Sequence, residues 1–200
     1  DLQHGIVDYQ AMVGMLQAIS TTPVVPMVRV PWLEPGILMK VLDAGAMGVI
    51  CPMINSAAEA AQFVSYLRYP PKGQRSFGPT RAAFAYGGYD TGAANDQILA
   101  LAMIETQAGV DNLEAIAATP GLDGLYIGPS DLTLGTRNGR LPPGFDREEP
   151  EIVELIRHIQ AVCAKNGLRA CLHCGEADYA AKAIGWGFDL TTVSGDTGLL

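Results

Sequence analysis

Short apolar runs alternate with amphipathic helical patterns along the whole chain, and this alternation limits the possible fold more than any other feature. The apolar runs predict strands near 24–30, 48–51, 100–104, 124–127, 168–172 and 189–193. The stretches between them predict helices near 9–19, 35–44, 57–67, 108–117, 150–165 and 177–184. Elements in this order form a parallel sheet, either a closed (β/α)8 TIM barrel or an open doubly wound sheet. No G-x-G-x-x-G motif follows a strand, so we favour the barrel.

The predicted barrel is a single domain over residues 1–200, trimmed at its N-terminus. A full (β/α)8 barrel has eight strands in about 250 residues, whereas only six are predicted here. Residues 1–5 are interpreted as a loop that follows a strand, so the first strand and most of the second are expected to be absent. The segment 69–92 is rich in glycine and proline, and we predict that it is irregular and covers a site or an interface.

Composition and charge exclude several kinds of partner. Hydrophobic residues make up 48% of the chain and charged residues 17%, which is typical of an α/β enzyme with buried strands. The net charge of −8 argues against nucleic acid and anionic membranes as partners, and no apolar run is long enough to span a bilayer. A core of this size needs no disulfides, so the four cysteines indicate the cytoplasm. Cys171-Leu-His-Cys174 resembles half a zinc site but lacks a second pair.

Two carboxylates follow neighbouring predicted strands. Glu105 ends one strand, and Asp131 follows the next, after Gly128-Pro129. Because the carboxyl ends of parallel strands meet at one edge of the sheet, we expect the two acids to lie close together. Two hard oxygen ligands at this edge predict a divalent metal site. The backbone N–H groups of Ser130 and Asp131, which follow Gly128, are expected to bind a substrate carboxylate.

A cation and an imidazole are predicted near the same edge. Arg29 lies near the end of an apolar strand, and it is either a partner in an internal salt bridge or a cation aimed at a carboxylate or a developing enolate. His4 lies on the opening loop and is either packed or catalytic. Asp1, three residues earlier, is placed to orient the imidazole and to raise its basicity.

The position of Asp43 is unusual for an acid. Asp43 lies near the C-terminal end of a predicted helix, where the helix dipole disfavours an acid. It is either solvated there or reaches another subunit.

The positions of the lysines exclude one mechanism. A Schiff-base aldolase needs a lysine on a barrel strand, whereas the lysines here fall on predicted helices or a loop: Lys40, Lys72, Lys165 and Lys182. Carbonyl chemistry in this chain therefore calls for a metal.

Six motifs in this order resemble the HpcH/HpaI aldolase family. They are Asp1-x-x-His4-Gly5, Arg29-Val-Pro31, Leu42-Asp43-Ala-Gly-Ala-x-Gly48, Arg68-Tyr-Pro-Pro-x-Gly73-x-Arg75, Ile104-Glu105-Thr106 and Gly121-x-Asp-Gly-x-x-Ile-Gly-Pro-x-Asp131-Leu. The resemblance covers essentially the whole chain. It implies a (β/α)8 barrel in a homo-oligomer, a trimer or hexamer, in which Asp43 reaches a neighbouring subunit's site. The family's C-terminal exchanged helix is not represented, so we expect the barrel to be trimmed at this end too.

The resemblance also implies a class II, metal-dependent pyruvate aldolase, and it assigns roles residue by residue. Glu105 and Asp131 match the two protein ligands of a divalent ion, which is Mg2+, Mn2+ or Co2+. Arg29 matches the arginine that holds the pyruvyl oxygen and stabilises the enolate. His4 matches the general base, which acts through water, and Asp1 matches its dyad partner.

The expected reaction is the reversible cleavage of a 4-hydroxy-2-oxoacid to pyruvate and an aldehyde. One alternative is a related barrel lyase that acts on acyl-CoA thioesters or on phosphonates. The negative charge weakens the thioester alternative, as does the scatter of the available arginines, Arg75, Arg81, Arg137 and Arg140.

A second alternative is a degenerate barrel that binds a ketoacid without turnover. Met103 favours it, because many members of the family carry a glutamine two residues before the metal-binding glutamate. Gln3 likewise replaces a glutamate that is common in the opening motif. The aldehyde is not identified, and His173 and Leu132 are either part of its pocket or ordinary packing residues.

Overall fold

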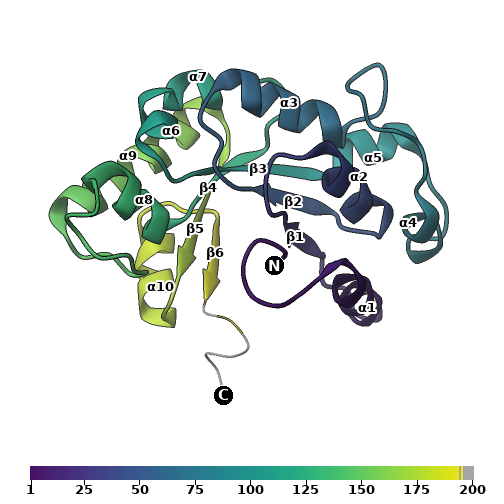
Figure 1. The fold of residues 1–200 in the computed structure, drawn as a ribbon, viewed down its shortest axis with the longest axis horizontal. Coiled ribbons are helices and arrows are strands. Elements are labelled where there is room, and N and C mark those ends of the chain that lie inside the picture. The colour runs from purple at the N-terminus through teal and green to yellow at the C-terminus, as the bar shows by residue number, and fades with distance from the viewer. Residues whose placement is uncertain (194, 196–200) are drawn as a thin grey trace.

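Six parallel strands form the centre of the protein in a computed structural model that describes residues 1–193 and 195. Each strand pairs with the next one along the chain, so the sheet always grows in the same direction. A doubly wound sheet would reverse that direction, and this alternative is therefore wrong. The sheet curls into part of a barrel (Figure 1). The strands are β1 Met27–Arg29, β2 Gly48–Cys51, β3 Leu99–Ile104, β4 Gly124–Ile127, β5 Arg169–Cys174 and β6 Leu190–Val193.

The helices line the convex side of this curved sheet, and the N-terminal segment lies on the concave side (Figure 1). Closure into eight strands and trimming at either end stay predictions. The helices are α1 Tyr9–Ile19, α2 Pro35–Asp43, α3 Ala57–Leu67, α4 Thr80–Ala85, α5 Thr91–Gln97, α6 Gln107–Asp111, α7 Leu113–Ala117, α8 Pro129–Arg137, α9 Pro150–Asn166 and α10 Ala177–Gly185.

Most predicted elements are confirmed, but one predicted helix is wrong and some helices were not predicted. The single helix predicted over 108–117 is wrong, because the helix breaks at Asn112, whose amide donates to the backbone oxygens of Asn55 and Ala108. Helix α8 was not predicted. Its apolar periodicity is weak, and the hydroxyls of Thr133 and Thr136 are satisfied by backbone carbonyls four residues earlier.

The segment 69–92 is more regular than predicted, since it contains α4 and the start of α5. Arg81 donates to the carbonyls of Leu16 and Ala44, and the hydroxyl of Tyr86 donates to Gly45. These carbonyls belong to the C-terminal ends of α1 and α2 or to the turn after α2. In a βα unit those helix ends lie at the edge where the strands begin, so the segment covers the edge opposite to the carboxyl ends of the strands.

Side chains alternate between the two faces of the sheet and form two hydrophobic clusters. The larger cluster includes Val49, Leu125 and Leu172 and packs against the helices. The smaller cluster lies on the concave face. Its buried members are Ile50, Leu101, Met103, Tyr126 and Cys171.

The cysteines do not form a zinc site, and the described helices are not membrane spans. All four cysteines are buried free thiols. Cys171 belongs to the concave cluster and Cys174 to the outer one, so the two sulfurs point to opposite faces and cannot share a metal ion. Within the described part of the chain, no helix combines the length and apolar character that crossing a membrane requires.

Candidate active site

A buried carboxyl group stands at the end of β3. Glu105 follows the strand directly and is 2% exposed. Its Oε1 accepts a hydrogen bond of 2.8 Å from the backbone N–H of Met53, which has a φ of 56°. A positive φ is uncommon for a residue with a Cβ, so the loop after β2 adopts a rare conformation where it holds this carboxyl group.

Gly128 leaves the space into which the second oxygen of Glu105 points. A Cβ on Gly128 would lie 2.6 Å from Oε2 of Glu105 and 2.9 Å from Cε of Met103. Ile104 pairs with Ile127 across the sheet, so Glu105 and Gly128 are level on neighbouring strands. Asp131 lies three residues further on, in the first turn of α8, and is partly exposed. The structure therefore brings the two predicted acids to one edge.

The surroundings of Glu105 favour its protonated form. Burial raises the pKa of Glu105 to about 7, and the negative charge of Asp131 acts in the same direction. The hydrogen bond from Met53 and the positive charge of Arg29 oppose this rise. A cation held between the two acids would stabilise the ionised form of both carboxylates. It would thereby offset the free-energy cost of burying the negative charge of Glu105.

The oxygen donors suit a hard divalent ion that keeps open positions. No group of three or more potential ligands among His, Cys, Asp and Glu occurs in the described residues. Mg2+ typically binds one or two protein carboxylates and takes its other ligands from water and substrate. Glu105 and Asp131 fit an ion of this kind, and the lack of a side chain at Gly128 leaves room for the Oε2 atom of Glu105.

Arg29 lies on the concave face at the end of β1, held by Asp1. The guanidinium donates from Nε to Oδ1 of Asp1 over 2.9 Å and from Nη2 to Oδ2. The structure thus brings Asp1 to Arg29 and not to His4. His4 is exposed, and no hydrogen bond from the described residues reaches its imidazole. The Asp1–His4 dyad stays a prediction.

The predicted carboxylate-binding loop begins α8. Gly128 is the N-cap residue and makes no side-chain cap, so the N–H groups of the first turn, among them those of Ser130 and Asp131, have no capping side chain. Helix α8 begins at the carboxyl edge of the sheet, where these groups and the partial positive charge of the helix N-terminus favour an anion.

Asp43 lies away from the other predicted residues. It ends α2 at the opposite edge of the sheet, and its Oδ1 accepts a hydrogen bond of 2.8 Å from Nη2 of Arg75. Burial raises the pKa of Asp43, and Arg75 opposes the rise. The side chain of Arg75 is fully buried and stacks on the ring of Tyr69 at 4.5 Å. A role for Asp43 in a neighbouring subunit stays a prediction.

Three polar side chains on the concave face extend the candidate site beyond Glu105. His173, Tyr126 and Thr192 form a hydrogen-bonded group on β5, β4 and β6. Reasoning from sequence considered His173 but missed Tyr126 and Thr192. The alternation of side chains along β4 places Tyr126 on the same face as Gly128, and this signal could have found it. Leu132, the other residue considered for the aldehyde pocket, packs in the outer cluster.

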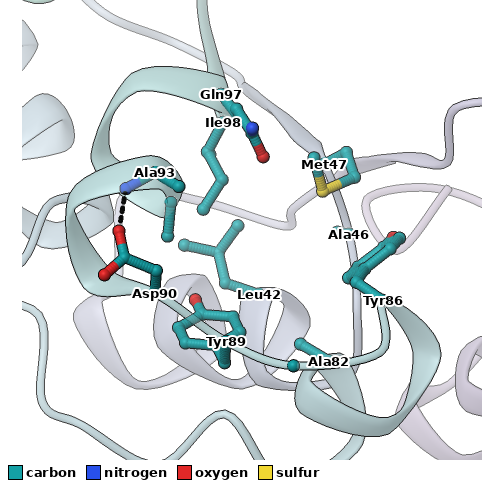
Figure 2. Close-up of a pocket in the computed structure, with 12 residues that line it drawn as sticks. Leu42, Ala46, Met47, Ala82, Tyr86, Tyr89, Asp90, Ala93, Gln97 and Ile98 are labelled. Atoms are coloured by element: carbon teal, nitrogen blue, oxygen red, sulfur yellow. Dashed lines mark hydrogen bonds between the residues drawn. The ribbon is translucent and has the colours of Figure 1, made fainter.

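A cavity of about 190 Å3 lies away from this site, at the edge where the strands begin. Met47 and Ile98 line it and come just before β2 and β3. Tyr86, Tyr89 and Gln97 also surround it (Figure 2). None of the residues predicted to be functional lines this cavity.

Comparison with known proteins gives matches over nearly the whole chain. A model of the family described as HpcH/HpaI aldolase/citrate lyase matches residues 1–197. A hydroxypyruvate/pyruvate aldolase of Rhizorhabdus wittichii is 38% identical over 200 residues, which are 100% of this chain and 78% of that protein. A 5-keto-4-deoxy-D-glucarate aldolase of Klebsiella pneumoniae is 36% identical over 202 residues, with 100% and 77% covered.

Solved structures show the same fold. An HpcH/HpaI aldolase/citrate lyase family protein of Burkholderia cenocepacia superposes with a TM-score of 0.86 at 30% identity, covering 96% of this chain and 76% of that one. An HpcH/HpaI aldolase of Desulfitobacterium hafniense superposes with a TM-score of 0.89 over 100% of this chain and 76% of its own, at 22% identity.

Proposed function

Because this chain belongs to the HpcH/HpaI aldolase/citrate lyase family, we propose that it is a carbon–carbon lyase that reversibly cleaves a 4-hydroxy-2-oxoacid to pyruvate and an aldehyde. The observation that carries this proposal is the buried carboxyl of Glu105, which faces the space beside Gly128. A buried acid with a pKa of about 7 is costly for stability, and such groups concentrate at functional sites.

Glu105 and Asp131 would hold the divalent ion, which we propose is Mg2+, Mn2+ or Co2+. When bound, the ion supplies a Lewis acid that polarises the carbonyl of the 2-oxoacid. The guanidinium of Arg29 offsets the negative charge that develops on the same oxygen during cleavage. Its Nη1 donates to no described residue and is available for this contact, since Asp1 engages Nε and Nη2.

The remaining predicted residues bind substrate or move a proton. The first-turn N–H groups of α8 at Ser130 and Asp131, next to Gly128, bind the carboxylate of the 2-oxoacid. His4 removes the proton from the C4 hydroxyl through water. If Asp1 is the dyad partner of His4, it must leave Arg29 at that step or bind both groups.

We further propose that the fold is that of a (β/α)8 barrel and that the enzyme is a homo-oligomer, a trimer or hexamer. Asp43 lies at the edge opposite to Glu105, so it can join an active site only in another subunit. The cytoplasm is the compartment that we propose, as expected from the free thiols.

Neither alternative function gains a specific observation. An acyl-CoA substrate needs a basic groove, but two of the arginines considered for it are engaged elsewhere. Arg75 pairs with Asp43, and Arg81 donates to carbonyls at the ends of α1 and α2. A binding protein without turnover would rest on Met103 alone, which lies buried in the concave cluster beside Gly128.

The decisive experiment measures metal-dependent release of pyruvate from a 4-hydroxy-2-oxoacid. Glu105→Ala should abolish it, and chelation of the wild-type protein should do the same until Mn2+ is restored. Glu114→Ala is the matched control, because Glu114 is an exposed acid on α7 that pairs with Lys165. Full activity of Glu105→Ala after removal of metal would contradict the proposal.

A further inference from the structure

The concave face carries a row of residues that continues beyond the proposed metal ligands. Ile104 pairs with Ile127, and Ile127 pairs with Leu172. The next residues on these three strands, Glu105, Gly128 and His173, are therefore level, and all face the concave side. Neighbouring strands are about 4.8 Å apart, which places the backbone of His173 about 10 Å from that of Glu105. The row thus runs from a proposed metal ligand across the concave face to His173.

Hydrogen bonds hold the imidazole of His173 in one orientation. Its Nδ1 lies 2.8 Å from Oγ1 of Thr192 and 3.3 Å from the hydroxyl of Tyr126. The hydroxyls of Tyr126 and Thr192 are 2.7 Å apart. If Tyr126 donates to Thr192 and Thr192 donates to Nδ1, both hydroxyl protons of the group have an acceptor. This arrangement makes Nδ1 the acceptor and leaves the ring proton on Nε2.

The imidazole is held in its neutral form. Burial lowers the pKa of His173, and the positive charge of Arg29 lowers it further, whereas Asp146 opposes the change. Arg29 also acts on Glu105 and on Tyr126, so these groups lie within the influence of one positive charge on the concave face. A neutral imidazole offers a single N–H donor without a charge.

A loop between α8 and α9 completes the surroundings of His173. Both carboxylate oxygens of Asp146 accept hydrogen bonds of 2.8 Å, one from the N–H of Gly175 and the other from that of Glu176. These bonds tie the loop to the turn after β5 and seat the ring of Phe145 against His173, with 4.4 Å between ring centroids. Phe145 is nevertheless 49% exposed, which leaves apolar surface at the mouth of the site.

We propose that His173 determines the specificity of the aldehyde half of the reaction, donating from Nε2 to a hydroxyl oxygen on the carbon next to the aldehyde carbonyl. The proposal rests on the proposed function and narrows it to short hydroxyaldehydes. A carboxylated aldehyde would place a second anion here against a neutral donor, while an unsubstituted aldehyde would leave the donor without a partner. Phe145 provides the apolar contact that a short carbon chain needs.

The test compares glycolaldehyde with acetaldehyde as acceptors for pyruvate in the presence of Mn2+. The two differ by one hydroxyl, so the ratio of their kcat/KM values reports the hydrogen bond. His173→Leu should lower the preference for glycolaldehyde about tenfold, the effect of losing one hydrogen bond, and should not lower acetaldehyde addition. His173→Gln keeps a donor and should retain most of the preference. Thr192→Val removes the partner of Nδ1 and should lower the preference to an intermediate value.

A second measurement separates this proposal from the proposed function. Exchange of the methyl protons of pyruvate with deuterium, followed by NMR, needs no aldehyde, and it should proceed equally in the wild type and in His173→Leu. His158→Leu makes the same change on an exposed position of α9 and should alter neither readout. An unchanged aldehyde preference in a His173→Leu protein that still exchanges would overturn the role of His173 alone. Absence of exchange in the wild type would overturn the proposed function, and the specificity proposal with it.

Discussion

Replacing Glu105 by glutamine should stabilise the metal-free protein at alkaline pH while removing its activity. Glutamine has the same shape, and its amide oxygen can still accept the hydrogen bond from the N–H of Met53. The substitution therefore removes the titratable group and little else. Functional acids in buried sites commonly cost stability in this way.

The magnitude follows from the pKa of the buried carboxyl. In the unfolded chain Glu105 ionises near its ordinary value of 4.5, and in the folded protein near 7. Between these pH values the folded state binds more protons than the unfolded state, so the free energy of unfolding falls as the pH rises and levels off above about pH 7. A tenfold change in an equilibrium is about 1.4 kcal/mol, so the total loss is roughly 3 kcal/mol.

Urea denaturation in a chelating buffer at about pH 5 and about pH 8 measures this difference. The wild type should lose unfolding free energy from about pH 5 to about pH 8, whereas Glu105→Gln should not. The advantage of the variant over the wild type should therefore grow by on the order of 2–3 kcal/mol between the two conditions. Glu114→Gln is a control with no pH dependence in this range. The hydrogen bond from Lys165 lowers the pKa of Glu114 from its ordinary value of 4.5, so its stabilising effect is lost only at more acidic pH, and the substitution should cost nearly the same at about pH 5 and about pH 8. If the difference in unfolding free energy between Glu105→Gln and the wild type does not change with pH, the reasoning is refuted.

Two further substitutions test the packing of the site and of the opposite edge. Gly128→Ala adds a methyl group 2.6 Å from Oε2 of Glu105. Because the carboxyl end can swing aside, the variant should fold normally but lose on the order of 100-fold in kcat/KM for pyruvate release. Arg75→Met leaves the half-buried carboxylate of Asp43 without its partner. The free energy of unfolding, measured by urea denaturation, should fall by about 3 kcal/mol.

Each of these predictions has a control within the chain. Gly14→Ala adds the same methyl group in α1 where nothing lies within 4 Å, so activity should be retained and stability should rise by about 0.5–1 kcal/mol. Lys72→Met breaks the exposed pair with Asp96 and should cost less than about 1 kcal/mol. Normal activity in Gly128→Ala, or equal costs for Arg75→Met and Lys72→Met, would contradict the structural interpretation.

Much of the fold follows from periodicity that can be read along the chain. The bounds predicted for β2 and β4 and for α1 and α3 are those of the structure, because each element has a clear apolar pattern and a defined start. Ser56, for example, caps α3 through the N–H of Glu59, as a capping box does. The irregular helix α8 escaped prediction because its stabilising contacts are hydroxyl–carbonyl bonds and close packing against the residues that follow β3 rather than an apolar stripe.

The candidate site, too, could be predicted from the sequence only in part. That Glu105 and Asp131 share an edge could be predicted, because parallel strands joined by helices bring their carboxyl ends together whatever the remaining details are. The partner of Asp1 could not, since nothing local distinguishes the guanidinium of Arg29 from the imidazole of His4. The alternation along β4 could have placed Tyr126 on this face, but its hydrogen bonds with Thr192 and His173 could not be predicted, because they depend on the register of three strands.

The sequence by itself determined the order of strands and helices, the face on which each residue lies and the edge where the acids gather, since these depend on periods of a few residues and on the handed βα unit. Only the tertiary structure decided which side chains touch across that edge. Partners such as Asp1 and Arg29 or Asp43 and Arg75 are remote in the chain, and their contacts depend on strand register, sheet curvature and rotamers, which the packing of the whole core sets together.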